Sequence, residues 1–194
     1  SGFFSDKTAP SAVMFDSVTV AGGNLSALAW QASNDSDVVY YVIYREDNSG
    51  FFVPIDSISA ADWATSMPWV YNLSNAENQS ENFVVTAVDS CGNQSSVGNT
   101  TPSSSIHLQI GIDPCDGYAR LRWGTYKTWT QTQPLEYNLY ADITDPVGGT
   151  ITGVLLKGGN LDTTFNHYGI INGYTYCYYV KAVDTTGAVT STSN

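Results

Sequence analysis

The stretch Tyr174–Gly187, "YTYCYYVKAVDTTG", has a counterpart near the middle of the chain, "NFVVTAVDSCGN" at Asn82–Asn93. Both copies are rich in β-branched and aromatic residues, pass through Ala-Val-Asp and reach a glycine. Such residues favour β-strands, and the glycine is typical of the turn that follows a strand. The repetition predicts that one β-rich unit occurs twice.

Three landmarks recur in the same order at nearly constant spacing. The pairs, with their separations in residues, are Gly92 and Gly187 (95), Trp30 and Trp123 (93), and Tyr41 and Tyr137 (96). Small differences of this kind are what loop insertions produce in a duplicated unit. A polar run with Pro102 separates the two copies. We therefore predict one domain over residues 8–101 and a second over residues 102–194.

The local pattern within each unit is that of β-strands. In "ARLRW", Ala119, Leu121 and Trp123 fall on one face and the two arginines on the other, which is the period of a half-buried strand. Turn segments such as "AGGN", "DNSG" and "KGGN" separate short runs of this kind, and no stretch has a comparable helical period. About seven strands in ~95 residues predict an all-β fold, with a β-sandwich in each unit.

Composition and charge narrow the classes of partner. Hydrophobic residues make up 42% of the chain, enough to bury a core. Lys and Arg number 7 against 18 Asp and Glu, giving a net charge of −11. This charge disfavours nucleic acid and anionic membrane surfaces as partners. No apolar run approaches the ~20 residues that span a bilayer, so we expect no membrane insertion.

Both units resemble fibronectin type III domains. The resemblance rests on the tryptophan of the second strand, the tyrosine of the third, and the Ala-Val-Asp strand before a glycine turn. In the second unit "IINGYTY" places Tyr176 at the position of the family's tyrosine corner, whereas Glu81 occupies that position in the first unit. The corner of the first unit must then be held in another way.

More narrowly, "DKTAPS", "VDSCGN" and "WGTYKTW" resemble paired modules in large surface proteins of gliding bacteria. The resemblance implies two tandem immunoglobulin-like (fibronectin type III) β-sandwiches. It further implies a non-catalytic spacer or adhesion segment of a larger secreted or cell-surface protein, whose other domains are its partners. The alternative is a carbohydrate-binding module or an accessory domain of an extracellular hydrolase.

The cysteines can be placed on the strands that the resemblance implies. Cys115 lies just before the second strand and Cys177 at the start of the sixth, and both strands start at the same pole of the sandwich. We predict a Cys115–Cys177 disulfide, with three reduced thiols as the alternative. Cys91 lies in a turn at the opposite end of its own unit and has no evident partner.

No catalytic motif is present. His107 and His167 are the two histidines, and neither belongs to a metal or nucleophile motif such as H-E-x-x-H or G-x-S-x-G. We predict that the chain is not an enzyme and needs no cofactor. Spacing in sequence leaves a pair of glycosidase carboxylates open, but the resemblance argues against it.

Four aspartates are expected at the N-terminal pole of the first unit: Asp6, Asp35, Asp37 and Asp89. Oxygen ligands that converge there would suit calcium. The alternative is that they are solvated loop residues and that Asp89 caps its own turn.

Three aromatic residues are expected on the outer face of the second unit. Tyr140 and Tyr179 lie on neighbouring strands and point outward by alternation, and Trp129 lies in the long loop between the second and third strands. They could bind a polysaccharide or a surface protein. The alternative is a purely structural pair, because aromatic cross-strand pairs stabilise exposed sheets by roughly 0.2–1 kcal/mol.

Overall fold

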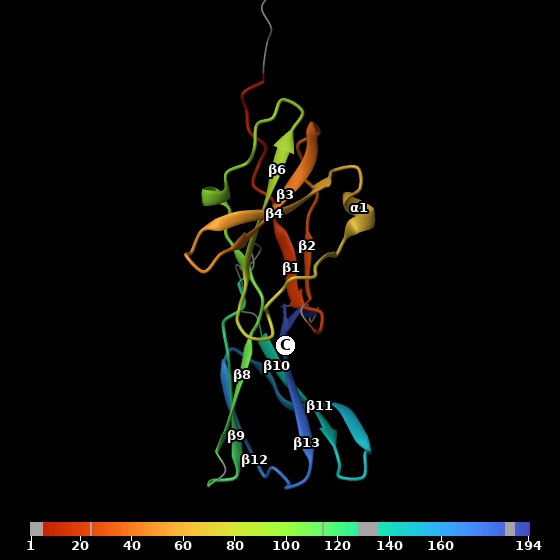
Figure 1. Cartoon of the computed structure of the whole chain (residues 1–194), viewed down its shortest axis with the longest axis vertical. Helices are drawn as coiled ribbons and strands as arrows, with labels where there is room; N and C mark the ends of the chain where they lie inside the picture. The colour runs from red at the N-terminus through yellow and green to blue at the C-terminus, as the bar shows by residue number, and fades with distance from the viewer. Residues whose placement is uncertain (1–5, 24, 114, 128–135, 185–188) are drawn as a thin grey trace, which may run out of the picture.

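The structure is a computed structural model that describes residues 6–194 except 24, 114, 128–135 and 185–188. Figure 1 shows an elongated molecule in which β1–β7 form one body and β8–β14 a second body that follows it end to end. The strands of the first body are β1 (Phe15–Val20), β2 (Ser26–Trp30), β3 (Val38–Glu46), β4 (Phe52–Ser59), β5 (Trp69–Tyr71), β6 (Asn82–Asp89) and β7 (Ser103–Ser104). Those of the second are β8 (Leu108–Asp113), β9 (Tyr118–Trp123), β10 (Glu136–Thr144), β11 (Thr150–Asn160), β12 (Thr164–Tyr168), β13 (Thr175–Val183) and β14 (Val189–Thr192). Two short helical turns, α1 (Trp63–Ser66) and η1 (Val97–Asn99), complete the described elements.

Each body pairs a three-stranded sheet with a four-stranded sheet, and every strand pair of the described chain is antiparallel. The sheet orders are β1-β2-β5 and β4-β3-β6-β7 in the first body, and β8-β9-β12 and β11-β10-β13-β14 in the second. The two bodies therefore repeat one topology. The predicted fold class, all-β with two tandem β-sandwiches, is confirmed.

Each sandwich has its own hydrophobic core. At the centre of the first, the rings of Trp30 and Tyr41 meet edge to face with centroids 6.0 Å apart and planes at 68°. Trp123 and Tyr137 repeat this contact in the second core with the same distance and angle. The two cores thus contain the same tryptophan–tyrosine contact although their sequences differ, which supports the predicted duplication.

The alternation in "ARLRW" correctly predicted which side chains are buried. Ala119, Leu121 and Trp123 are buried in the second core, and Arg120 and Arg122 are exposed. A strand buries alternate side chains when only one face of its sheet is covered, so the pattern is local and can be recognised from sequence.

The chain crosses from one sandwich to the other just after β7. Ser103 and Ser104 pair with Phe83 and Asn82 of β6, and so belong to a sheet of the first sandwich. Ile106 is buried in the core of the second. The crossing therefore lies later than the predicted cut before Pro102, because the polar serines complete a strand rather than form a linker.

The tyrosine corner expected in the second sandwich is present. The phenol oxygen of Tyr176 accepts a hydrogen bond of 3.1 Å from the backbone N–H of Ile171. This bond ties the start of β13 to the turn that precedes it, as the corner does in immunoglobulin-like sandwiches.

In the first sandwich an ion pair with a buried carboxylate stands at the corner position. The Glu81 carboxylate accepts hydrogen bonds from the Arg45 guanidinium at 2.8 Å and from the Ser74 hydroxyl at 2.6 Å. Ser74 also lies 2.7 Å from the hydroxyl of Ser26 on β2. Glu81 is 4% exposed, so Ser26 on β2 is linked through Ser74 to a carboxylate that is almost removed from solvent and that also binds Arg45 on β3.

Candidate functional site

The predicted aromatic face lies on the outer side of the four-stranded sheet in the second sandwich. Tyr140 on β10 stands opposite Tyr179 on β13, and their rings are stacked with centroids 5.3 Å apart and planes 13° apart. The Lys181 amine lies 5.2 Å from the Tyr140 centroid and 5.6 Å from that of Tyr179. Tyr178 and Val180, which alternate with these residues, are buried, so the face points away from the core as expected.

The stacked geometry limits what this face can bind. Each ring turns one face toward the other ring, and the nearby lysine adds a cation–π contact, so the pair resembles a cross-strand contact that stabilises the sheet. Burial, followed by the negative charge of Asp142, raises the pKa of the Tyr179 phenol. Trp129 lies outside the described residues. The binding role of the three aromatic residues stays a prediction.

Three of the four predicted aspartates come together at the N-terminal pole of the first sandwich. Asp6, Asp37 and Asp89 each place a carboxylate oxygen within 4.8 Å of the others. Asp35 is not part of this group. Its carboxylate accepts a hydrogen bond of 2.7 Å from the backbone N–H of Ser11, which lowers the pKa of Asp35.

Asp89 caps its own turn, as the alternative interpretation expected. Its carboxylate accepts bonds of 2.8 Å from the backbone N–H groups of Cys91 and Asn93 and from the Asn93 side-chain amide. Burial alone would raise the pKa of Asp89, but these bonds and one from the Gly92 N–H outweigh it and lower the pKa. The calcium site stays a prediction, and thermal melts with calcium and with a chelator test it: an unchanged Tm would contradict it.

The predicted disulfide is not formed, since Cys91, Cys115 and Cys177 are all free and exposed. Cys115 lies in the turn between β8 and β9, at the end of one sheet. Cys177 lies on β13 of the other sheet, opposite Asp142 of β10 and on the outer face. Two cysteines at the same pole need side chains that point toward each other to form a disulfide, and the outward direction of Cys177 prevents this.

Neither histidine stands in an arrangement typical of a catalytic site. His167 on β12 shares a hydrogen bond of 2.8 Å with the phenol of Tyr178 on the facing sheet, and the Tyr176 ring meets it edge on at 5.5 Å. Burial lowers the pKa of His167 and raises the pKa of Tyr178 to about 12. The contact joins the two sheets of the second sandwich. Within the described part of the chain, Nδ1 of His107 is buried without a hydrogen-bond partner.

The most extensive arrangement of functional groups is one that sequence reasoning missed, at the junction between the sandwiches. The phenol oxygen of Tyr126, in the loop after β9, accepts a hydrogen bond of 2.9 Å from the backbone N–H of Val18 on β1. The Ser191 hydroxyl on β14 donates to the Val18 carbonyl at 2.6 Å. Tyr126, Ser191 and Val18 are at most 2% exposed, so these bonds are buried.

Further hydrogen bonds lie around the two that bind Val18. The backbone N–H of Thr192 donates to the Thr19 hydroxyl at 2.8 Å, and that hydroxyl lies 3.3 Å from the Thr192 carbonyl. The Asn194 side chain accepts from the Leu108 N–H at 2.7 Å and donates to the Glu77 carbonyl at 3.0 Å. Main-chain and side-chain groups of both sandwiches therefore fix their relative orientation. In the sequence, Tyr126 is one of two aromatic residues, with Trp129, in the loop after β9, and nothing marks it as a junction residue.

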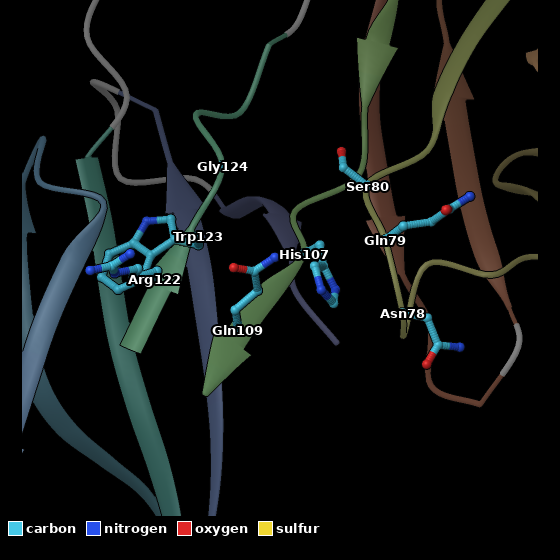
Figure 2. A pocket seen from close by; sticks show the side chains of 8 residues that line it. All are labelled: Asn78, Gln79, Ser80, His107, Gln109, Arg122, Trp123 and Gly124. Carbon is cyan, nitrogen blue, oxygen red and sulfur yellow. The ribbon is translucent and has the colours of Figure 1, made fainter. Parts of the chain in front are cut away.

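A cavity of about 400 Å³ opens at the same junction. Figure 2 shows His107 and Gln109, at the start of β8, beside the loop of the first sandwich that carries Asn78, Gln79 and Ser80. The remaining lining residues, from the end of β9, are Arg122, Trp123 and Gly124. The described lining combines amide, hydroxyl, imidazole, guanidinium and indole side chains and includes no carboxylate, so it lacks the carboxylate pair that glycosidases use.

Comparisons with known proteins add little to this description. No family model matches the chain, and no curated protein matches it. Among solved structures, the chain aligns with the crystal structure of a tetra-tandem repeat in the extending region of a large adhesion protein. It has 12% identity and a TM-score of 0.24, and it covers 94% of this chain and 49% of that one. The chain thus spans about half the length of that structure, and so low a score transfers neither fold nor function.

The structure itself defines the class of protein, a pair of tandem β-sandwiches joined by a buried polar junction. Among the described residues, no helix is both long and apolar enough to cross a membrane.

Proposed function

We propose that the chain is a non-catalytic spacer or adhesion segment of a larger secreted or cell-surface protein, and that its partners are other domains of the same polypeptide. The observation that carries the proposal is the junction, where the Tyr126 phenol and the Ser191 hydroxyl bind the two main-chain groups of Val18. Two domains of one chain are mobile relative to each other unless their interface holds them. Buried hydrogen bonds are directional, so a junction of this kind keeps two sandwiches in line.

The finer assignment is to fibronectin type III-like sandwiches of a bacterial surface protein. The repeated order of three- and four-stranded sheets and the Tyr176 corner bond support it. No cofactor is proposed. Nucleic acid and anionic membrane surfaces remain disfavoured as partners, because the net charge of −11 repels both.

A carbohydrate-binding module is the second candidate, and the stacked pair of Tyr140 and Tyr179 is the observation that favours it. Exposed aromatic rings bind the apolar faces of sugars. The same surface would suit an accessory domain of an extracellular hydrolase. Because each ring already has one face on the other, we place this candidate second.

Small-angle X-ray scattering tests the spacer function. The wild-type chain should scatter as one elongated particle of the shape in Figure 1. The variant with Tyr126→Phe and Ser191→Ala loses the side-chain groups that bind Val18, so it should scatter as an ensemble of bent shapes. A wild-type chain that already scatters as a bent ensemble would contradict the proposal.

A glycan array with the wild-type chain separates the two candidates. Binding that Tyr179→Ala abolishes, with the fold unchanged by circular dichroism, would favour the carbohydrate-binding module. Hydrolysis of any glycan would contradict a non-catalytic role.

A further inference from the structure

Strand β8 in the second sandwich is the counterpart of β1 in the first. Both are edge strands of a three-stranded sheet. The register shows which residues correspond: Val18 pairs with Leu28 and Ile110 pairs with Leu121, while Val20 pairs with Ser26 and Ile112 with Ala119. Val18 and Val20 therefore have Ile110 and Ile112 as their structural equivalents.

The equivalent residues differ sharply in exposure. Val18 and Val20 are 0% and 6% exposed, whereas Ile110 and Ile112 are 50% and 74% exposed. Ile110 and Ile112 alternate with Gln109 and Gly111 and share the strand face of the buried Leu108, so they point toward the core side of the sheet. An isoleucine side chain at a core-facing position is normally buried by neighbouring side chains.

In the first sandwich, the cover comes partly from the sandwich that follows. Strand β14 lies against β1, and β7 lies against it as well. The Tyr126 phenol and the Ser191 hydroxyl occupy the N–H and carbonyl of Val18 that face away from β2. An edge strand presents unpaired main-chain groups, and here the neighbouring sandwich satisfies them.

The edge of β8 has no such cover in the described part of the chain. No hydrogen bond joins the outward N–H or carbonyl of Ile110 to a described residue. Two hollows of about 280 and 170 Å³ lie beside β8 on the outer face of the sheet, and both are lined by Gly111 and Arg120. The free edge and the uncovered isoleucines belong to the same strand.

We propose that the β8 edge is a docking surface for a further β-sandwich of the same kind, which covers Ile110 and Ile112 as the second sandwich covers Val18 and Val20. The partner presents a tyrosine phenol and a serine hydroxyl to the main chain of Ile110. The inference rests on the proposed function, since it assumes a series of sandwiches. A second copy of this chain fits less well, because its own Tyr126 and Ser191 are already bound to Val18.

One difference between the edges of β1 and β8 suggests a substitution that tests the docking. Gly111 stands between the two isoleucines where Thr19 stands between the two valines. The Thr19 hydroxyl bonds to the main chain of Thr192, and a glycine cannot. Gly111 does not have a positive φ, and a Cβ there would lie 3.9 Å from the Arg120 carbonyl oxygen, so Gly111→Thr fits without strain.

The test uses a chain extended after Asn194 by a copy of residues 100–194, which is in register because Asn99 and Asn194 are 95 positions apart. Hydrogen exchange of the Ile110 amide should slow at least ~10-fold relative to the 194-residue chain, because the appended copy of Tyr126 would accept its hydrogen. Tyr126→Phe in the appended copy alone should restore fast exchange. Gly111→Thr should slow the exchange further.

A matched pair of substitutions tests the apolar contact. Ile112→Asp should leave the Tm of the 194-residue chain within ~1 °C of wild type, because the side chain is 74% exposed, and lower that of the extended chain by roughly 5–10 °C. Ile151→Asp, on the exposed face of β11, is the control and should have little effect in either chain.

Three results would overturn the proposal. The first is equal exchange of the Ile110 amide, and equal effects of Ile112→Asp, in both chains. The second is full protection of the Ile110 amide by an appended copy of residues 100–105 alone. That result would mean that a strand equivalent to β7, and not a further sandwich, covers the edge. The third is dimerisation of the 194-residue chain that Ile112→Asp abolishes, which would assign the edge to a second copy. Each of these leaves the straight junction between the present two sandwiches intact, so a failure of docking is distinguishable from a failure of the spacer function.

Discussion

The phenol oxygen of Tyr126 lies 2.9 Å from the backbone nitrogen of Val18, a residue 108 positions earlier in the chain. The bond joins a loop of the second sandwich to an edge strand of the first, and both residues are buried. Burial strongly raises the pKa of this phenol, so it stays protonated across the physiological range and can accept the Val18 hydrogen while donating its own. Tyr126 is therefore one of the side chains that fix the orientation of the two sandwiches, together with Ser191 on β14.

We expect Tyr126→Phe to lower the free energy of unfolding by about 1–3 kcal/mol. The substitution keeps the ring and its packing but leaves the buried N–H of Val18 without an acceptor. Urea denaturation followed by tryptophan fluorescence measures the loss. Tyr168→Phe is the control, because the Tyr168 side chain is 65% exposed and its loss of a hydroxyl should cost less than about 0.5 kcal/mol. Equal stabilities of the two variants would argue against a junction held by Tyr126.

The two corners should respond differently to truncation. Glu81→Ala leaves the Arg45 guanidinium and the Ser74 hydroxyl without their acceptor in a mostly buried site, and we expect a loss of about 3 kcal/mol. Tyr176→Phe removes only the bond to the exposed Ile171 amide and should cost about 1 kcal/mol or less. Scanning calorimetry of both variants measures the difference. A smaller loss for Glu81→Ala than for Tyr176→Phe would contradict the structural role of the ion pair.

Much of the fold could be predicted from the sequence because the relevant signals are local. Burial alternates along each strand, so "ARLRW" alone indicates that Leu121 points inward and Arg120 outward, as observed. Because the unit is duplicated, each element could be predicted from two sequences. The matching tryptophan–tyrosine contacts in the two cores explain why Trp30 and Trp123 recur.

The junction and the first corner depend on contacts that no local pattern encodes. Glu81 in the place of a tyrosine indicated that the corner was held differently, but not that Arg45 and Ser74 would hold it. Nothing in the sequence around Val18 indicated a partner 108 residues away. The disulfide prediction failed for a different reason: it used strand order, which places two cysteines at one pole, although the alternation along β13 already puts Cys177 on the outer face.

The three cysteines should therefore react as independent thiols. We expect intact-mass analysis after alkylation without reductant to show three added groups, because Cys91, Cys115 and Cys177 are all free and exposed. Cys177→Ser should reduce this to two. A single added group in the wild-type chain that rises to three after reduction would show that a disulfide forms in solution.

His167 makes the stability of the second sandwich depend on pH. Burial holds its pKa in the folded protein below the ordinary value near 6.5, which the unfolded chain retains. The unfolded state therefore binds the proton more readily, so the stability that the neutral ring contributes is complete above pH 6.5. It should decline as the pH falls from there through the folded-state pKa. NMR titration of the His167 ring should give a midpoint below 6.5, and unfolding experiments between pH 7 and 5 should show the loss. His167→Gln can keep a hydrogen bond to Tyr178 without a titrating group, so that variant should lose this part of the pH dependence. A midpoint above 6.5, with stability that rises on acidification, would contradict the burial argument.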